Sequence, residues 1–215
     1  MSLDNTLSKP GKAALSRDAA SVRGRILDAA LQEFMAVGYA KTNTARIASA
    51  FGISTATIFR HFGTKQQLFE AVIRRIAARW HDHIDWEHID AADPETWLTR
   101  FGEAALHWIM TDETLFVGRM AIVEGPAHSE ITDIWPKYAA APIIEILSAK
   151  FSGWQRAGLL MDMPPELLAT AFLDLTLSGE VSRALYSPQQ LKPHRDQPAH
   201  VRNCVTIFLR GCMIR

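Results

Sequence analysis

The chain has 215 residues, 48% of them hydrophobic and 21% charged, and its 23 lysines and arginines balance 23 aspartates and glutamates. This composition is typical of an ordinary soluble globular protein of one or two domains. No apolar run approaches the roughly 20 residues that cross a bilayer, and the first residues lack the apolar centre of a signal peptide. The sequence therefore predicts a cytoplasmic protein without a membrane partner.

The balanced net charge conceals an asymmetry along the chain. Residues 1–80 contain 12 lysines and arginines against 5 aspartates and glutamates, whereas the remaining 135 residues contain 11 against 18. A basic N-terminal part attracts phosphate groups, and an acidic remainder does not compete for them. The asymmetry is weak evidence by itself, but it indicates which part of the chain could meet nucleic acid.

Residues 1–20 carry Ser, Lys, Pro, Gly and Ala without sustained periodicity, and we expect them to form a flexible N-terminal arm. The first helix is predicted from about Ser21 to Val37, with Gly38 at its end. Its expected role is to pack against the helices that follow.

Two short helices joined by a tight turn are predicted next. Thr44 is the expected N-cap of the first, whose apolar positions, Ile47 and Phe51 among them, recur at three- and four-residue spacing. Gly52 suits the left-handed backbone of a turn that ends this helix. Ser54 is the expected cap of the second helix, residues 55–62.

The second short helix has an apolar and a polar side. Ile58, Phe59 and Phe62 form its predicted inward stripe, and the opposite side is polar and cationic. After a glycine break, the run from Thr64 to Gln67 matches the S/T-x-x-E/Q capping box, which predicts that a long third helix starts there. The whole reads as a helix-turn-helix with a following support helix.

A helix-turn-helix places its second helix in the major groove of DNA, with its flanks toward phosphate. Hydroxyl side chains can bond bases or phosphates, and cationic side chains donate to the backbone. The candidate DNA-binding residues are Thr44, Arg46, Thr55, Ala56, Thr57, Arg60, His61 and Lys65. From periodicity alone, a helical hairpin in an all-α enzyme remains an equal alternative.

Residues 25–74 resemble the N-terminal domain of TetR-type transcriptional regulators position by position. The matched features are Ile26, Leu27, Ala30 and Phe34 before Gly38-Tyr39, then Thr44, Ile47 and Ala48, then Gly52-Ile53-Ser54, Ile58-Phe59-x-His61-Phe62, and Lys65 with Leu68. The family usually carries a tyrosine at the position of Phe59, and its hydroxyl commonly reaches a DNA phosphate. We therefore expect this contact to be missing here and Phe59 to face the core.

The support helix is expected to continue from Lys65 through residue 84 and to link the DNA-binding part to the rest of the chain. A patch rich in histidine and aspartate follows, formed by His81, Asp82, His83, Asp85, His88 and Asp90. Two histidines that bind one metal from a helix favour a spacing of four, whereas the first two here are two apart. A solvated helix end is the better interpretation, and neither a metal nor a cofactor is expected.

Further amphipathic or apolar helices are predicted from Asp93 to the C-terminus, broken at prolines and glycines. The fold class is therefore all-α, with about nine helices and no convincing strand. We expect a helix-turn-helix domain of three helices at residues 21–70 and a ligand-binding and dimerisation domain at residues 71–215. The layout from Arg119 to Gly158 loosely resembles the ligand-binding half of the TetR branch with AefR-like C-terminal domains.

Two other function classes compete with a DNA-binding regulator. An α-helical enzyme would need a catalytic motif, but the sequence contains no nucleophile elbow, P-loop, G-x-G-x-x-G run or metal-ligand spacing, so no catalytic residue is predicted. A sequence-indifferent architectural DNA binder would not need so many aromatic residues outside the basic part. Salt-dependent binding without sequence preference would favour that alternative.

The acidic C-terminal part is rich in aromatic side chains, most of which must be plain core. Cavities that bind small apolar molecules between helices are lined by the same residue types, and the family resemblance favours such a pocket. The candidate ligand-binding residues are Trp108, Phe116, Met120, Trp135, Phe151, Trp154 and Phe172.

The two terminal helices carry small and apolar residues in register, which could pair with a symmetry mate in a four-helix interface. The candidate dimer residues are Leu168, Phe172, Leu175, Gly179, Val201, Val205, Phe208 and Cys212. The sequence thus predicts a homodimeric transcriptional regulator, most readily a repressor, that binds double-stranded palindromic operator DNA. A small apolar or amphipathic effector of unknown identity is expected to release it.

Overall fold

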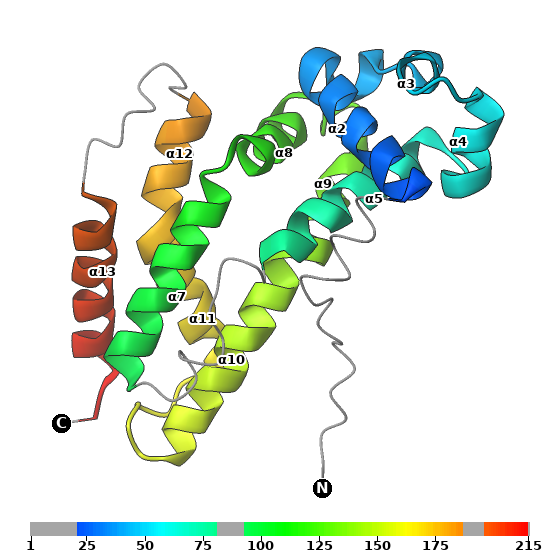
Figure 1. The fold of residues 1–215 in the computed structure, drawn as a ribbon. Helices are drawn as coiled ribbons and strands as arrows, with labels where there is room; N and C mark the ends of the chain where they lie inside the picture. Colours follow the sequence, from blue (N-terminus) through cyan, green and yellow to red (C-terminus); the bar gives the residue numbers. More distant parts are fainter. Residues whose placement is uncertain (1–20, 81–92, 187–195, 215) are drawn as a thin grey trace, which may run out of the picture. The chain divides into compact units, whose positions relative to one another are not determined.

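The computed structural model describes residues 21–80, 93–186 and 196–214 (Figure 1). The chain divides into two compact units, residues 1–82 and 83–215. Within the described residues the chain forms nine continuous helical stretches and no strand, which confirms the predicted all-α class. The expected N-terminal arm and the histidine- and aspartate-rich patch at 81–90 lie outside the described residues.

The first unit consists of α2 (Val22–Lys41), α3 (Thr44–Ala50), α4 (Thr55–Phe62) and α5 (Lys65–Ala78). The Ser21 hydroxyl caps α2 by accepting from the amide of Gly24 at 2.9 Å. Gly38, with φ of 82°, interrupts α2 at the position where its end was predicted, and one more turn follows. The boundary expected at residue 70 falls inside α5, all of which belongs to the first unit.

The core of the first unit lies between α2 and α5. Phe34 and Phe69 meet edge to face with ring centroids 5.0 Å apart, and Tyr39 also meets Phe69 at 5.0 Å. Arg75 of α5 donates to the Gly24 carbonyl at 2.9 Å and forms an ion pair with Asp28 of α2. These contacts hold the two longest helices of the unit together, so α3 and α4 rest on a fixed support.

The second unit begins with α7 (Pro94–Ile109) and α8 (Asp112–Val123). Asp93 caps α7 as the sequence predicted, because its carboxylate accepts from the amides of Glu95 at 3.0 Å and Thr96 at 3.1 Å. Then α9 (Ser129–Trp135), the π-helical segment η2 (Pro136–Ala140) and α10 (Ala141–Arg156) form one continuous helix. Two prolines in this stretch remove backbone donors, and the π-helical segment lets the helix pass them.

The last two helical stretches of the second unit pack against α7. The first consists of α11 (Pro165–Leu173), the π-helical segment η3 (Asp174–Ser178) and α12 (Gly179–Tyr186), and the second is α13 (Gln197–Cys212). Both α13 and η3 contact α7. His200 of α13 donates from Nε2 to the Thr176 carbonyl at 2.9 Å, and the Cys204 thiol donates to the Leu175 carbonyl at 3.4 Å. Side chains of α13 thus satisfy carbonyls of the π-helical segment.

The core of the second unit is an aromatic cluster. Its members are Trp97, Phe101, Phe151, Trp154, Phe172 and Phe208. Each ring meets at least one other at a centroid distance between 4.8 Å and 6.5 Å. Both cysteines are free and buried, and burial raises the pKa of the Cys212 thiol above its ordinary value. None of the helices in the described ranges combines the length and apolar character that a bilayer crossing requires.

Candidate DNA-binding interface

The turn between α3 and α4 is fixed by its glycine. Gly52 has φ of 62°, and its amide donates to the Ser49 carbonyl at 3.2 Å, while the Ile53 amide donates to the Ala48 carbonyl at 3.1 Å. This pair of bonds is the Schellman motif, which requires a left-handed residue after the helix. The motif ends α3 abruptly, and α4 can therefore start three residues later in a new direction.

Capping residues set the start of each helix in the motif. Ser54 accepts from the Thr57 amide at 3.1 Å, and Thr64 accepts from the Gln67 amide at 3.1 Å, as predicted for α4 and α5. The prediction for α3 was wrong by one residue. The cap is Asn43, whose Oδ1 accepts from the Ala45 amide at 2.8 Å, because an Asn side chain bonds readily to a backbone amide two residues on. Thr44 is therefore the first residue of the helix.

The inward side of α4 is narrower than predicted. Ile58 and Phe62 are buried, but 43% of Phe59 is exposed, so its expected core-facing role was wrong. Ile58 and Phe62 are four residues apart and share one side of the helix, whereas Phe59 lies about 100° around the axis from Ile58. An exposed phenylalanine therefore belongs to the outer surface of α4, and sequence reasoning missed it there.

The remaining outer surface of α4 carries polar side chains at the predicted positions. Ala56, Arg60 and His61 are exposed, and Thr55 and Thr57 are partly exposed. The Thr57 hydroxyl lies 3.0 Å from the Ser54 hydroxyl, so the cap also orients a side chain of the first helical turn. The structure thus brings five of the eight candidate residues together on one helix of the first unit.

Two cations outside α4 have partners within the first unit. Arg46 Nε lies 3.1 Å from Glu33 Oε1, and the Arg46 side chain remains 65% exposed. Lys65 Nζ donates to the Ala40 carbonyl at 3.0 Å and lies 4.8 Å from the centroid of the Tyr39 ring. Arg46 can still reach outward, whereas Lys65 links the start of α5 to the end of α2.

The predicted ligand-binding residues fall into three groups. Phe151, Trp154 and Phe172 lie in the aromatic cluster that forms the core of the second unit. Phe151 and Trp154 meet each other, Trp154 also meets Trp97, and Phe172 meets Phe101. Trp108 and Trp135 form a separate stacked pair, with ring centroids 5.5 Å apart. Phe116 and Met120 of α8 are buried. The side chains of the first group pack against other rings of the core.

Most of the predicted dimer residues are enclosed within their own subunit. The buried members are Leu168, Phe172, Val201, Val205, Phe208 and Cys212. Side chains that pack α11 and α13 onto α7 cannot also face a partner. Leu175 and Gly179 are exposed, and so are Leu167 of α11, at 51%, and Ile207 of α13, at 61%.

Comparison with known families agrees with this geometry. A family model for bacterial regulatory proteins of the tetR family matches residues 26–72. A second model, for the C-terminal domain of AefR-like transcriptional repressors, matches residues 96–211, which is more than half of the chain. The chain therefore belongs to the TetR family of transcriptional regulators, and its first unit contains the DNA-binding helix-turn-helix of that family.

Individual relatives are similar over part of the sequence or over the fold. Over 49 residues the chain is 51% identical to YvkB, an uncharacterized HTH-type transcriptional regulator of Bacillus subtilis strain 168, and the match spans 23% of this chain and 26% of that protein. A TetR-family structure from Mesorhizobium loti MAFF303099 matches with a TM-score of 0.78 and 21% identity, covering 93% of this chain and 98% of the other.

Two further proteins of known structure have names that state what they respond to or what they regulate. The flavonoid-responsive regulator FrrA matches with a TM-score of 0.75 at 21% identity, over 93% of this chain and 99% of the other. The fatty acid degradation regulator FadR of Bacillus halodurans matches with a TM-score of 0.64 at 19% identity, over 89% and 98%. At these identities the likeness concerns the fold.

Proposed function

We propose that this chain is a homodimeric repressor that binds a palindromic operator through α4 and is released by a small effector in its second unit. The observation that carries the proposal is the outer surface of α4, where Ala56, Arg60 and His61 are exposed and Thr55 and Thr57 are partly exposed. In a helix-turn-helix the second helix enters the major groove, and hydroxyl and cationic side chains contact bases and phosphates there.

Selection of bound duplexes from a random DNA pool tests this proposal directly. A palindromic consensus is the expected result, because a symmetric dimer presents the same helix to each half-site. The two copies of α4 should contact half-sites whose centres lie about 34 to 36 Å apart, or a multiple of one helical turn. Salt-dependent binding without any enriched sequence would instead support an architectural DNA binder.

The exposed side of the last helices is the proposed dimer surface. Leu167, Leu175 and Gly179 recur at spacings of eight and four residues along the stretch from α11 to α12, and Ile207 is exposed on α13. These helices contact each other, and exposed large apolar side chains on neighbouring helices are typical of subunit interfaces. Regulators of this family act as dimers, which supports the same assignment.

The proposed effector site is near the stacked rings of Trp108 and Trp135, with Phe116 and Met120 of α8 as further candidate contacts. The names of the two relatives that respond to flavonoids or regulate fatty acid degradation support an effector with a large apolar part. An effector shifts DNA binding only by the difference of its affinities for the two states of the protein. A coupling free energy of about 1 to 3 kcal/mol would lower operator affinity roughly 5- to 150-fold.

Thermodynamic reciprocity provides the test of effector control. Calorimetric titration of an identified effector, with and without operator DNA, should give two affinities that differ by the same factor by which the effector changes operator affinity. Trp108→Ala should weaken effector binding in both titrations, since it removes one of the two stacked rings. Equal effector affinity in the presence and absence of operator would contradict release by this route.

A further inference from the structure

One large apolar side chain lies on the outer surface of α4. Phe59 is 43% exposed, whereas Phe34, Phe62 and Phe69 of the same unit are each at most 7% exposed. Within the part of the chain that the structure describes, Phe59 forms no ring contact with another aromatic side chain. A ring that stays in water contributes little hydrophobic stabilisation to the fold. The exposed ring is therefore available to a binding partner.

The position of Phe59 on α4 places its ring beside the first helical turn. Residues three and four apart are neighbours on a helix surface, so Phe59 adjoins Thr55 and Ala56. A helical side chain also leans toward the N-terminus and covers the turn before its own Cα. Arg60 and His61 lie further around the helix axis. The outer surface of α4 thus has a cationic half and an apolar half, the latter formed by the Thr55 and Ala56 methyl groups and the Phe59 ring.

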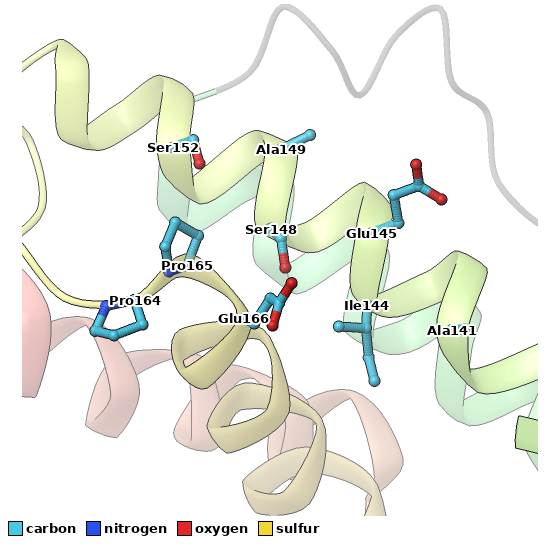
Figure 2. Close-up of a pocket in the computed structure, with 9 residues that line it drawn as sticks. All are labelled: Ala141, Ile144, Glu145, Ser148, Ala149, Ser152, Pro164, Pro165 and Glu166. Carbon is cyan, nitrogen blue, oxygen red and sulfur yellow. The ribbon is translucent and has the colours of Figure 1, made fainter.

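The charge of the surrounding surface indicates that the partner of this ring is DNA. Residues 1–80 contain 12 lysines and arginines against 5 aspartates and glutamates, and the helix-turn-helix lies within them. In the second unit, by contrast, the groove between α10 and α11 is lined by the exposed carboxylates of Glu145 and Glu166 and by no cationic side chain (Figure 2). Phosphate groups are attracted to the basic unit and repelled by the acidic groove.

The chemistry of the major groove narrows the contact to one group. The first turn of the second helix of a helix-turn-helix faces base edges, and the Phe59 ring covers that turn. Base edges there carry hydrogen-bond donors and acceptors, which a phenylalanine ring cannot satisfy, and only thymine adds a methyl group, at C5. A phosphate would lose hydration against the ring without gaining a hydrogen bond. The small side chains of Thr55 and Ala56 let α4 approach the base pairs closely enough for the ring to reach them.

We propose that Phe59 is a specificity-determining residue whose ring packs against the C5 methyl group of an operator thymine. The inference rests on the proposed docking of α4 in the major groove and adds the base that this side chain reads. Burial of one methyl group corresponds to about a 4-fold change in affinity. A symmetric dimer makes the contact once in each half-site, so loss of both methyl groups should weaken binding roughly 15-fold.

Replacement of thymine by uracil in the selected operator tests this contact, because deoxyuridine lacks only the C5 methyl group and still pairs with adenine. Each thymine is replaced in turn, at symmetric positions of both half-sites, and the affinity of the full chain is measured at one salt concentration. At one position the replacement should weaken binding by the parent roughly 15-fold. Phe59→Ala should bind the thymine operator more weakly than the parent does, and it should bind the thymine and uracil operators within about 2-fold of each other at that position.

Phe51→Ala is the matched control variant. Phe51 is another exposed phenylalanine of the first unit, at 38%, but it is the C-cap of α3 and lies outside α4. This variant should retain the full response of the parent to uracil. Phe59→Ala should fold like the parent, because Phe59 is exposed and alanine is the most favourable helix residue. Circular dichroism establishes the helical content of both variants.

The outcomes separate this contact from the proposed regulatory function. If the chain selects an operator and loses no affinity on any uracil replacement, the operator-binding role stands and the thymine contact is wrong. The contact is also wrong if the parent and Phe59→Ala respond alike to every replacement, since the ring then reads no methyl group. A chain that enriches no duplex from the random pool loses both the operator-binding role and the contact.

Discussion

The ammonium group of Lys65 lies 4.8 Å from the ring centroid of Tyr39, and it donates a hydrogen bond to the neighbouring Ala40 carbonyl at 3.0 Å. From the sequence, Lys65 was a candidate phosphate contact at the start of the support helix. The structure gives its ammonium group two partners at the end of α2. Lys65 therefore helps to fix the ends of α2 and α5 relative to each other, whatever it contacts on DNA.

The first prediction is that Lys65→Ala destabilises the protein. Loss of a cation–π contact and of a hydrogen bond from a charged donor should lower the free energy of unfolding by about 1 kcal/mol. Urea denaturation of the full chain measures this change. Arg60→Ala is the control, because an exposed side chain without such contacts should alter stability by less than about 0.5 kcal/mol. Equal stability of the parent and Lys65→Ala would mean that these contacts contribute nothing in solution.

The second prediction separates backbone contacts from base contacts on α4. Arg60→Ala should weaken binding to all sequences alike and reduce the salt slope of binding by about one unit, as expected for a phosphate contact. Thr55→Ala should relax base preference at one operator position and leave the salt slope unchanged. Repeating the duplex selection with each variant measures both effects. The proposed docking of α4 is untenable if neither variant differs from the parent.

The third prediction concerns the left-handed turn. Gly52 has φ of 62° and nothing lies within 4 Å of an added Cβ, so Gly52→Ala meets no neighbour and suffers only backbone strain. That strain should lower the free energy of unfolding by about 1 kcal/mol or slightly more. Gly153→Ala is the matched control. Its added Cβ also meets nothing, but it lies inside α10, where alanine is favoured by about 0.5 to 1 kcal/mol. Urea denaturation should show that Gly52→Ala lowers the free energy of unfolding and that Gly153→Ala raises it.

The fourth prediction distinguishes an exposed dimer surface from the core. Leu175→Glu and Ile207→Glu change exposed side chains and should dissociate the dimer while the helical content remains. Phe208→Glu should instead unfold the second unit, because Phe208 meets Phe151 and Phe172 at 5.6 and 5.4 Å and an unpaired buried carboxylate costs several kcal/mol. Sedimentation and circular dichroism report the two outcomes. A folded dimer for both surface variants would place the interface elsewhere.

The fifth prediction follows from the cap of α7. Hydrogen bonds from the amide and hydroxyl of Thr96 hold the pKa of Asp93 below its ordinary value of about 3.8. Because the pKa is lower in the folded state, the stabilisation is present above the unfolded pKa and is lost as pH falls through the folded pKa. Asp93→Ala should therefore be less stable than the parent at neutral pH, and the difference should shrink below about pH 4. Thermal unfolding of both proteins as a function of pH measures this. A stability difference between the parent and Asp93→Ala that stayed constant from neutral pH to below pH 4 would contradict the prediction.

Local signals in the sequence determined much of the first unit. Gly52 requires a left-handed turn, and Ser54 and Thr64 can each accept from an amide three residues later, so short-range backbone chemistry sets these boundaries. The same reasoning placed the start of α7 at Asp93. These predictions succeeded because each depends on residues within one turn of the chain, which a sequence displays directly.

Tertiary packing decided the rest. Phe59 and Phe208 are both apolar residues on amphipathic helices, yet the first is exposed and the second is buried among rings from α10 and α11. Helical periodicity identifies the apolar side of a helix. It does not show how much of that side a neighbouring helix buries, or whether that neighbour belongs to the same subunit. The contact between α10 and α11 likewise arises from two helices that meet only in the folded unit. Such contacts depend on residues far apart in sequence, and only the three-dimensional structure brings them together.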